Sequence, residues 1–108
     1  MFVFHVKATV APGREAEYEE WKIREGDLQL KAPGFIKRLL LKDKENPGLY
    51  YYVSFWESEE QCQTFAATPE FKAAHQHFNP QATFIEPMDR FECDVIFDEA
   101  GLNRTVTA

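Results

Sequence analysis

Residues 49–78 read LYYYVSFWESEEQCQTFAATPEFKAAHQHF, and they predict a strand followed by two short helices. The first eight, LYYYVSFW, are mostly aromatic and contain neither Gly nor Pro, so we expect a strand over residues 49–56. Ser58 with Gln61 three residues later has the pattern of a capping box, which begins a helix. Thr68-Pro69 joins an N-cap residue to Pro at the first helical position, which begins a second helix over residues 69–78.

Both short helices carry an apolar face. Cys62, Phe65 and Ala66 are expected on the inner face of the first. In the second, the inner stripe has the spacing i, i+3, i+4, i+7, which is typical of a helix packed on a core. Its members are Phe71, Ala74, His75 and Phe78.

The flanking sequence supplies the remaining elements. Asn46-Pro47-Gly48 predicts a turn between two hairpin strands, and Pro33-Gly34 ends the helix before them. The expected elements outside residues 49–78 are a strand at 2–10, a helix at 13–31, a strand at 35–42 and strand-like residues at 83–86 and 90–97. The order β-α-β-β-α-β predicts an α+β fold of the ferredoxin-like kind. We expect one domain over residues 1–98 and a tail over residues 99–108.

Helices on one side of an antiparallel sheet bury that face only, and the other face stays uncovered. In strand 2–10 the even-numbered residues from Phe2 to Val10 are expected under the helices. The uncovered face is predicted to mix apolar and polar side chains, which is typical of an interface and favours a homodimer joined sheet to sheet. We assign to it Val3, His5, Lys7, Ile36, Arg38, Leu40, Tyr50, Tyr52, Ser54, Asp94 and Ile96.

Composition and charge exclude several classes of function. Twelve basic and eighteen acidic residues give a net charge of −6, and no basic run is present, which disfavours nucleic acid and anionic membranes as partners. No apolar run has transmembrane length, and no leader is recognisable, so we expect a cytoplasmic protein. Cys62 and Cys93 are isolated and lack the spacing of a zinc site or a disulfide framework.

Three stretches carry a resemblance to a known family. Phe55 to Phe78, APGFIKRLLL at 32–41 and APGREAEYEEW at 11–21 resemble the antibiotic-biosynthesis-monooxygenase superfamily. TPEFKAAH at 68–75 is most similar to its IsdG-type haem-degrading monooxygenases. The resemblance implies a dimeric α+β barrel.

The resemblance to the haem-degrading branch also implies a haem site. His75 falls on the position of the iron ligand, so haem is a candidate cofactor and His75 a candidate catalytic residue and metal ligand. Val6 falls where that branch has an Asn, and Phe65 where it has a Trp. Val6, Phe65 and Phe71 would then line the haem. Because Val6 cannot donate a hydrogen bond, the resemblance implies haem binding more strongly than haem degradation.

Two alternatives stay open. In the cofactor-independent branch of the superfamily, oxygen reacts with a bound phenol or quinol, and His75 would act as base or anchor. An apolar pocket suits such a ligand, and its walls would be Phe4, Val6, Phe65, Phe71 and Phe78. The other alternative is a dimer that binds a small molecule without catalysis, because fold alone does not decide function.

Overall fold

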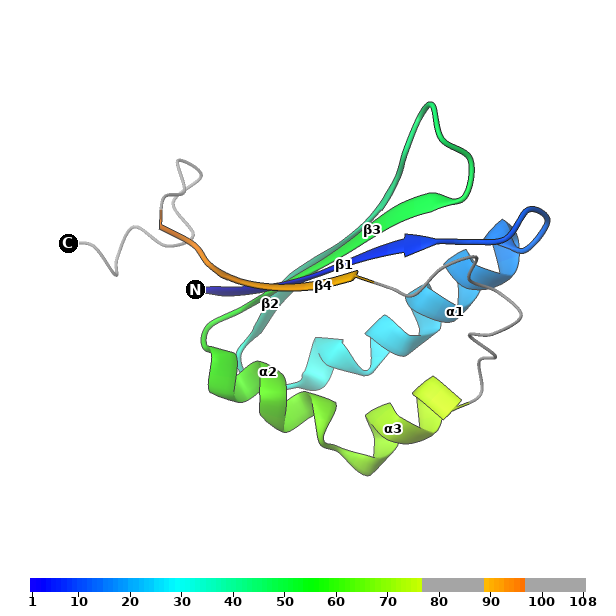
Figure 1. Ribbon diagram of the computed structural model, residues 1–108. Coiled ribbons are helices and arrows are strands. Elements are labelled where there is room, and N and C mark those ends of the chain that lie inside the picture. Colours follow the sequence, from blue (N-terminus) through cyan, green and yellow to red (C-terminus); the bar gives the residue numbers. More distant parts are fainter. Residues whose placement is uncertain (77–88, 97–108) are drawn as a thin grey trace.

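The computed structural model describes residues 1–76 and 89–96, with side chains for residues 1–74 and 89–96. Within these ranges the elements follow one another in the predicted order (Figure 1). They are β1 (Phe2–Thr9), α1 (Glu15–Asp27), the 3-10 turn η1 (Gln29–Lys31), β2 (Phe35–Lys42), β3 (Leu49–Trp56), α2 (Glu59–Ala66), α3 (Pro69–Gln76) and β4 (Asp89–Asp94).

The four strands form one antiparallel sheet in the order β2-β3-β1-β4. This is the ferredoxin-like arrangement, so the predicted fold class is confirmed. Strands β2 and β3 have the predicted bounds. β4 ends at Asp94 and is shorter than the predicted 90–97, while the strand-like residues 83–86 lie outside the described ranges.

All three helices lie on one face of the sheet (Figure 1). Their buried residues form two clusters with the even-numbered residues of β1. Tyr18 and Trp21 of α1 pack on Ala8, Val10 and Tyr50. The other cluster joins Phe2 and Trp56 to Phe65 of α2.

None of the helices in the described residues is long and apolar enough to cross a membrane.

Part of the predicted uncovered face was wrong. Residues paired directly across antiparallel strands share a face. Tyr52 pairs with Val6 and Ser54 with Phe4, so β3 turns its even-numbered residues toward the helices. Six residues that were predicted on the uncovered face lie on the helix side instead. They are Arg38, Leu40, Tyr50, Tyr52, Ser54 and Asp94.

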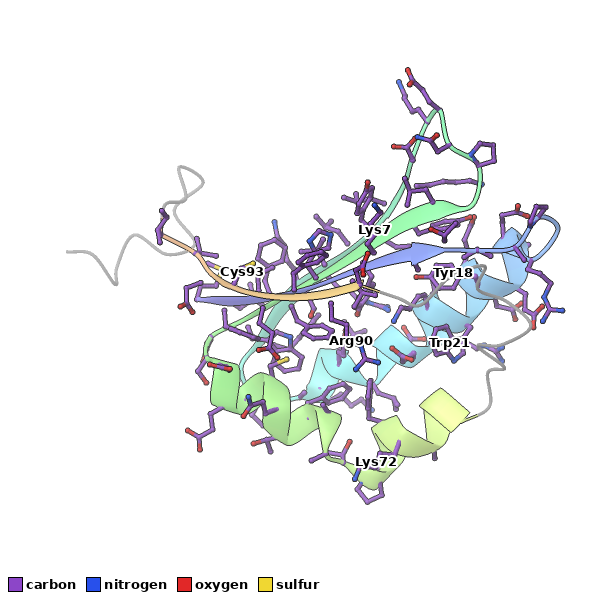
Figure 2. The ribbon with its side chains drawn as sticks, in the orientation of Figure 1. Lys7, Tyr18, Trp21, Lys72, Arg90 and Cys93 are labelled. Carbon is purple, nitrogen blue, oxygen red and sulfur yellow. The ribbon has the colours of Figure 1, made fainter. Side chains whose placement is uncertain are left out.

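The uncovered face is instead an apolar band, which we call the outer face. Lys7 and Cys93 point away from the helices, while Arg90 points toward them (Figure 2). Val3, His5 and Lys7 lie on this face as predicted. Ile96 follows the end of β4 and is 89% exposed. The polar members of the outer face are Lys7, Thr9, Lys37 and Asp89, and it otherwise comprises Val3, His5, Leu39, Leu41, Leu49, Tyr51, Val53, Phe55, Phe91 and Cys93.

The helix predicted over residues 13–31 is α1 followed by η1, and Leu28 between them is exposed. Gly26 lets β2 approach this end of α1. A Cβ at Gly26 would lie 1.3 Å from Nη1 of Arg38. That guanidinium donates to the carbonyl oxygens of Lys22 and Ile23, so Arg38 holds the end of α1 against the sheet.

Candidate functional site

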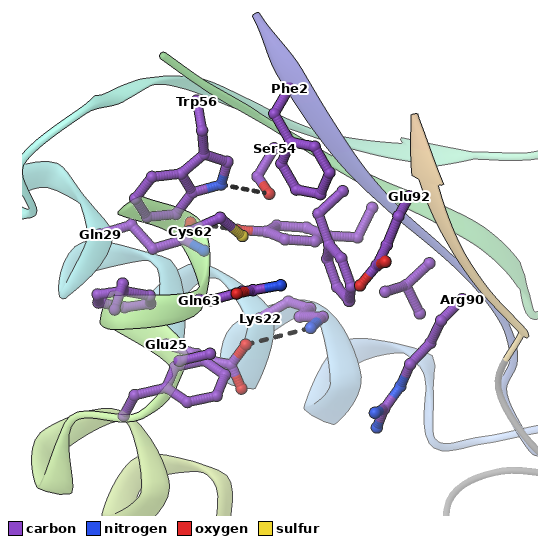
Figure 3. A pocket seen from close by; sticks show the side chains of 16 residues that line it. Phe2, Lys22, Glu25, Gln29, Ser54, Trp56, Cys62, Gln63, Arg90 and Glu92 are labelled. Atoms are coloured by element: carbon purple, nitrogen blue, oxygen red, sulfur yellow. Dashed lines mark hydrogen bonds and ion pairs between the residues drawn. The ribbon is translucent and has the colours of Figure 1, made fainter. Parts of the chain in front are cut away.

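A cavity of about 230 Å³ lies between the sheet and the helices (Figure 3). Its walls come from β1, β3, β4 and all three helices. The aromatic side chains that line it are Phe2, Phe4, Tyr52, Trp56, Phe65 and Phe71. A mostly apolar cavity with a few polar groups is the usual form of a small-molecule site.

Four of the predicted site residues meet in this cavity. Phe4 and Val6 reach it from β1, Phe65 from α2 and Phe71 from α3. Phe78 lies outside the described residues. His75 belongs to α3, but its side chain is outside the described part. The roles predicted for these residues therefore remain predictions.

Helix caps place the aromatic residues of α2 and α3. The Ser58 hydroxyl accepts from the backbone N–H of Gln61 at 3.2 Å, and the Thr68 hydroxyl accepts from that of Phe71 at 3.3 Å. Phe65 and Phe71 then meet edge to face, with ring centroids 5.1 Å apart. Both predicted caps are thus confirmed, and they fix one wall of the cavity.

Another wall carries a buried ion pair. Lys22 Nζ lies 3.2 Å from Glu25 Oε1, and the two side chains are 6% and 3% exposed. The ammonium also lies over the rings of Tyr52 and Trp21, 4.4 and 4.9 Å from their centroids. Burial lowers the pKa of Lys22, and Glu25 partly opposes that shift. Desolvation therefore destabilises the ammonium despite its ion pair.

Tyr52 joins the same polar end of the cavity. Its hydroxyl is hydrogen-bonded to the side-chain oxygen of Gln29. Burial raises the pKa of Tyr52 to about 12. The phenol is therefore neutral at physiological pH and serves as a donor.

β4 contributes one cation and one anion. Arg90 pairs with Val6 and Glu92 with Phe4 in the sheet register, so both side chains face the cavity. The positive charge of Arg90 lowers the pKa of Lys22 further. Burial raises the pKa of the Cys62 thiol to about 11, and the negative charge of Glu92 contributes to this increase. Arg90 and Glu92 therefore bring one positive and one negative charge to the cavity wall.

This polar end was not predicted from the sequence. The buried residues of α1 and η1 follow the helical spacing i, i+4, i+7, i+11, in a stripe formed by Tyr18, Lys22, Glu25 and Gln29. That spacing is visible in the sequence, but three of the four residues are polar and read as a solvated face.

Among the described residues, no group of three or more His, Cys, Asp or Glu could hold a metal ion.

Comparison with known proteins decides the family. Residues 1–77 match the model of the family described as antibiotic biosynthesis monooxygenase. The chain belongs to the antibiotic biosynthesis monooxygenase family. It is 33% identical over 75 residues to a "Heme oxygenase (mycobilin-producing)" of Mycobacterium tuberculosis, which covers 68% of this chain and 69% of that protein.

Solved structures of other proteins share the fold. SnoaB of Streptomyces nogalater, a cofactor-independent oxygenase, superposes with a TM-score of 0.78 at 19% identity, covering 91% of this chain and 95% of SnoaB. A conserved protein of Methanosarcina mazei gives a TM-score of 0.75 at 16% identity, covering 85% and 89% of the two chains. At such identities the likeness shows the fold alone.

The described walls do not fit haem. The cavity of about 230 Å³ lies below the range of roughly 300–1,000 Å³ that is usual for drug-sized ligands, and a porphyrin is a large ligand of that class. Val6 and Phe65 line the cavity with apolar side chains, and the Lys22–Glu25 pair fills part of a wall. One or two fused rings suit this volume better.

Proposed function

We propose that this protein is a monooxygenase that oxidises a small phenol or quinol in the cavity without a bound cofactor. The observation that carries the proposal is the aromatic cavity with one polar end, in a chain of the antibiotic biosynthesis monooxygenase family. The rings of Phe4, Phe65 and Phe71 would hold the substrate by its faces. The polar end would orient its oxygen.

The chemistry balances without an external reductant. A phenol and O₂ give a quinone and water. One oxygen atom enters the ring, the other leaves as water, and the ring C–H and the phenol O–H are lost. The electrons come from the substrate itself, so the protein has to bind, orient and exclude water.

Oxygen uptake tests this proposal. Purified protein is incubated with 1-naphthol under ¹⁸O₂, with heat-denatured protein as control. We expect oxygen consumption above the control and one ¹⁸O atom in the naphthoquinone product. A Phe71→Ala variant should lower the rate, because a ring that packs against Phe65 at 5.1 Å is removed from the cavity wall. Binding of naphthol without oxygen uptake would instead favour a small-molecule binding protein.

Haem binding is the second candidate, favoured by the similarity to the mycobacterial haem oxygenase and by the place of His75 in α3. A haem titration followed at the Soret band, with His75→Ala in parallel, separates the two candidates. A saturable shift that the variant loses would favour haem with His75 as ligand. From the size of the cavity we expect no saturable shift.

We also infer that the protein works as a homodimer. The outer face is a band of apolar side chains that the helices leave uncovered, and Leu39, Leu41 and Phe91 are 42%, 45% and 45% exposed. An apolar patch of this kind typically marks an interface. A twofold axis would let the face cover itself.

A further inference from the structure

We propose that Lys22 and Glu25 form an oxyanion subsite, which takes an acidic hydroxyl of the substrate as its anion while the ring lies against Phe65 and Phe71. This inference deepens the proposed function and rests on it. It narrows the substrate to aromatic molecules with an ionisable hydroxyl, and it makes Lys22 rather than His75 the group that holds the reacting oxygen.

The first argument is the free-energy cost of burying the Lys22–Glu25 ion pair. Lys22 and Glu25 are both almost fully buried, and their charged atoms lie 3.2 Å apart. A buried ion pair is a poor source of stability, because the desolvation of two charges rivals their attraction. A structural role would be served equally well by two apolar residues on this face of α1. Strongly perturbed buried charges in a cavity are typical of functional sites.

The second argument is the free hydrogen-bonding capacity of the ammonium. An ammonium has three N–H donors. Of the described residues, only Glu25 accepts a hydrogen bond from Lys22 Nζ, and the other close groups are the faces of Tyr52 and Trp21. Figure 3 shows Lys22 reaching into the cavity beside Glu25, with Arg90 on the far side. An oxygen placed in the cavity could accept one of the remaining N–H groups.

The third argument is the balance of charge around that ammonium. The groups that face Lys22 are Glu25 on its own helix, Tyr52 on β3, and Arg90 and Glu92 on β4. Arg90 repels Lys22. An oxyanion between Lys22 and Arg90 would relieve this repulsion. A neutral ligand of the same shape would not.

The proton balance is simple. The O–H bond of the substrate breaks and its proton leaves to water, while Lys22 stays an ammonium and donates an N–H group to the new oxyanion. The result is an ammonium between two anions, the Glu25 carboxylate and the bound oxyanion. A phenolate is more electron-rich than a phenol, so this step prepares the substrate for oxygen.

The test uses a matched pair of single-ring probes, 4-nitrophenol and its methyl ether 4-nitroanisole. Binding is followed by quenching of tryptophan fluorescence, because Trp56 lines the cavity. The yellow phenolate band of 4-nitrophenol reports its ionisation directly. The protein is the full chain, compared with Lys22→Met/Glu25→Gln, which removes both charges and keeps the volumes. The matched control is Arg24→Met/Glu20→Gln, which removes an exposed ion pair from the same helix.

For the wild type and the control variant we expect binding to lower the pKa of 4-nitrophenol by at least about one unit, so that the phenolate band grows at a pH where the free probe is neutral. We expect the anion to bind about tenfold tighter than 4-nitroanisole, the ratio that one pKa unit implies. In Lys22→Met/Glu25→Gln the band should vanish, while 4-nitroanisole still binds within about twofold of the wild type.

Two results would overturn the subsite alone: both probes bind to the wild type without a phenolate band, or the band persists in the double variant. If neither probe binds to the wild type, the aromatic cavity proposed as the active site is itself refuted, and the subsite falls with it. Failure of the proposed function and failure of the subsite are thus distinguishable.

Discussion

At the scale of single residues, the Lys22–Glu25 pair makes the sharpest energetic prediction. Lys22→Met leaves the Glu25 carboxylate buried without its cation, which typically costs about 3–5 kcal/mol in free energy of unfolding. Lys22→Met/Glu25→Gln removes both charges and should recover most of that loss. Urea denaturation of the three proteins measures the difference. A single variant as stable as the wild type would mean that Glu25 has another cation.

The same variant should respond to pH in a defined direction. An unpaired buried carboxylate has a raised pKa in the folded state. Its folded form then binds more protons than the unfolded chain, so the deficit of Lys22→Met should be smallest below about pH 4.3 and grow as the pH rises. Urea midpoints at about pH 4 and about pH 8, referred to the wild type, test this sign.

A prediction of the same sign concerns Tyr52 at alkaline pH. Its pKa is raised from 10.0 to about 12 by burial. Between these values the unfolded tyrosine loses its proton and the folded one keeps it, so the contribution of Tyr52 to stability is lost as the pH rises from 10 to 12. Tyr52→Phe should flatten this decline, whereas Tyr51→Phe on the outer face should leave it. Equal alkaline slopes for wild type and Tyr52→Phe would contradict the prediction.

At the scale of elements, the Ser58 cap links the start of α2 to the cavity. Ser58→Ala removes the acceptor for the Gln61 N–H and should cost about 1 kcal/mol in free energy of unfolding. Because α2 carries Phe65 into the cavity, the variant should also weaken binding of 4-nitroanisole. Ser58→Asn keeps a capping oxygen and is the control. A loss as large in Ser58→Asn would show that the hydroxyl does not act as a cap.

The elements also show what could be predicted from the sequence. Caps, turns and apolar runs are local signals, and they gave the bounds of β2 and β3 and both caps. The face of each residue in β3 is not local, because Tyr50, Tyr51 and Tyr52 are identical in type and show no alternation. Only the pairing of Tyr52 with Val6 decides it. That is why Phe4, Phe65 and Phe71 were correctly predicted to line the cavity, whereas Tyr52 was placed on the wrong face.

At the scale of the whole molecule, the outer face predicts an assembly. A row of side chains crosses the sheet from Leu39 through Val53 and His5 to Phe91. The His5 ring lies 5.3 Å from that of Phe91, and its Nε2 is buried with no hydrogen-bond partner in the described part of the chain. Burying such an atom without a partner is unfavourable. A second copy laid on this face would cover the apolar row and could supply the missing partner.

Val53→Asp tests this assembly at the middle of the row. A charge there should be tolerated by a solvated monomer and rejected by a sheet-to-sheet interface, since a buried unpaired charge is strongly unfavourable. Light scattering at micromolar concentration should give twice the chain mass of 12.6 kDa for the wild type and 12.6 kDa for Val53→Asp. Leu30→Asp is the matched control, because Leu30 is 62% exposed and lies on η1, which is not part of the outer face. A wild type that scatters as a monomer would leave the outer face without a partner copy.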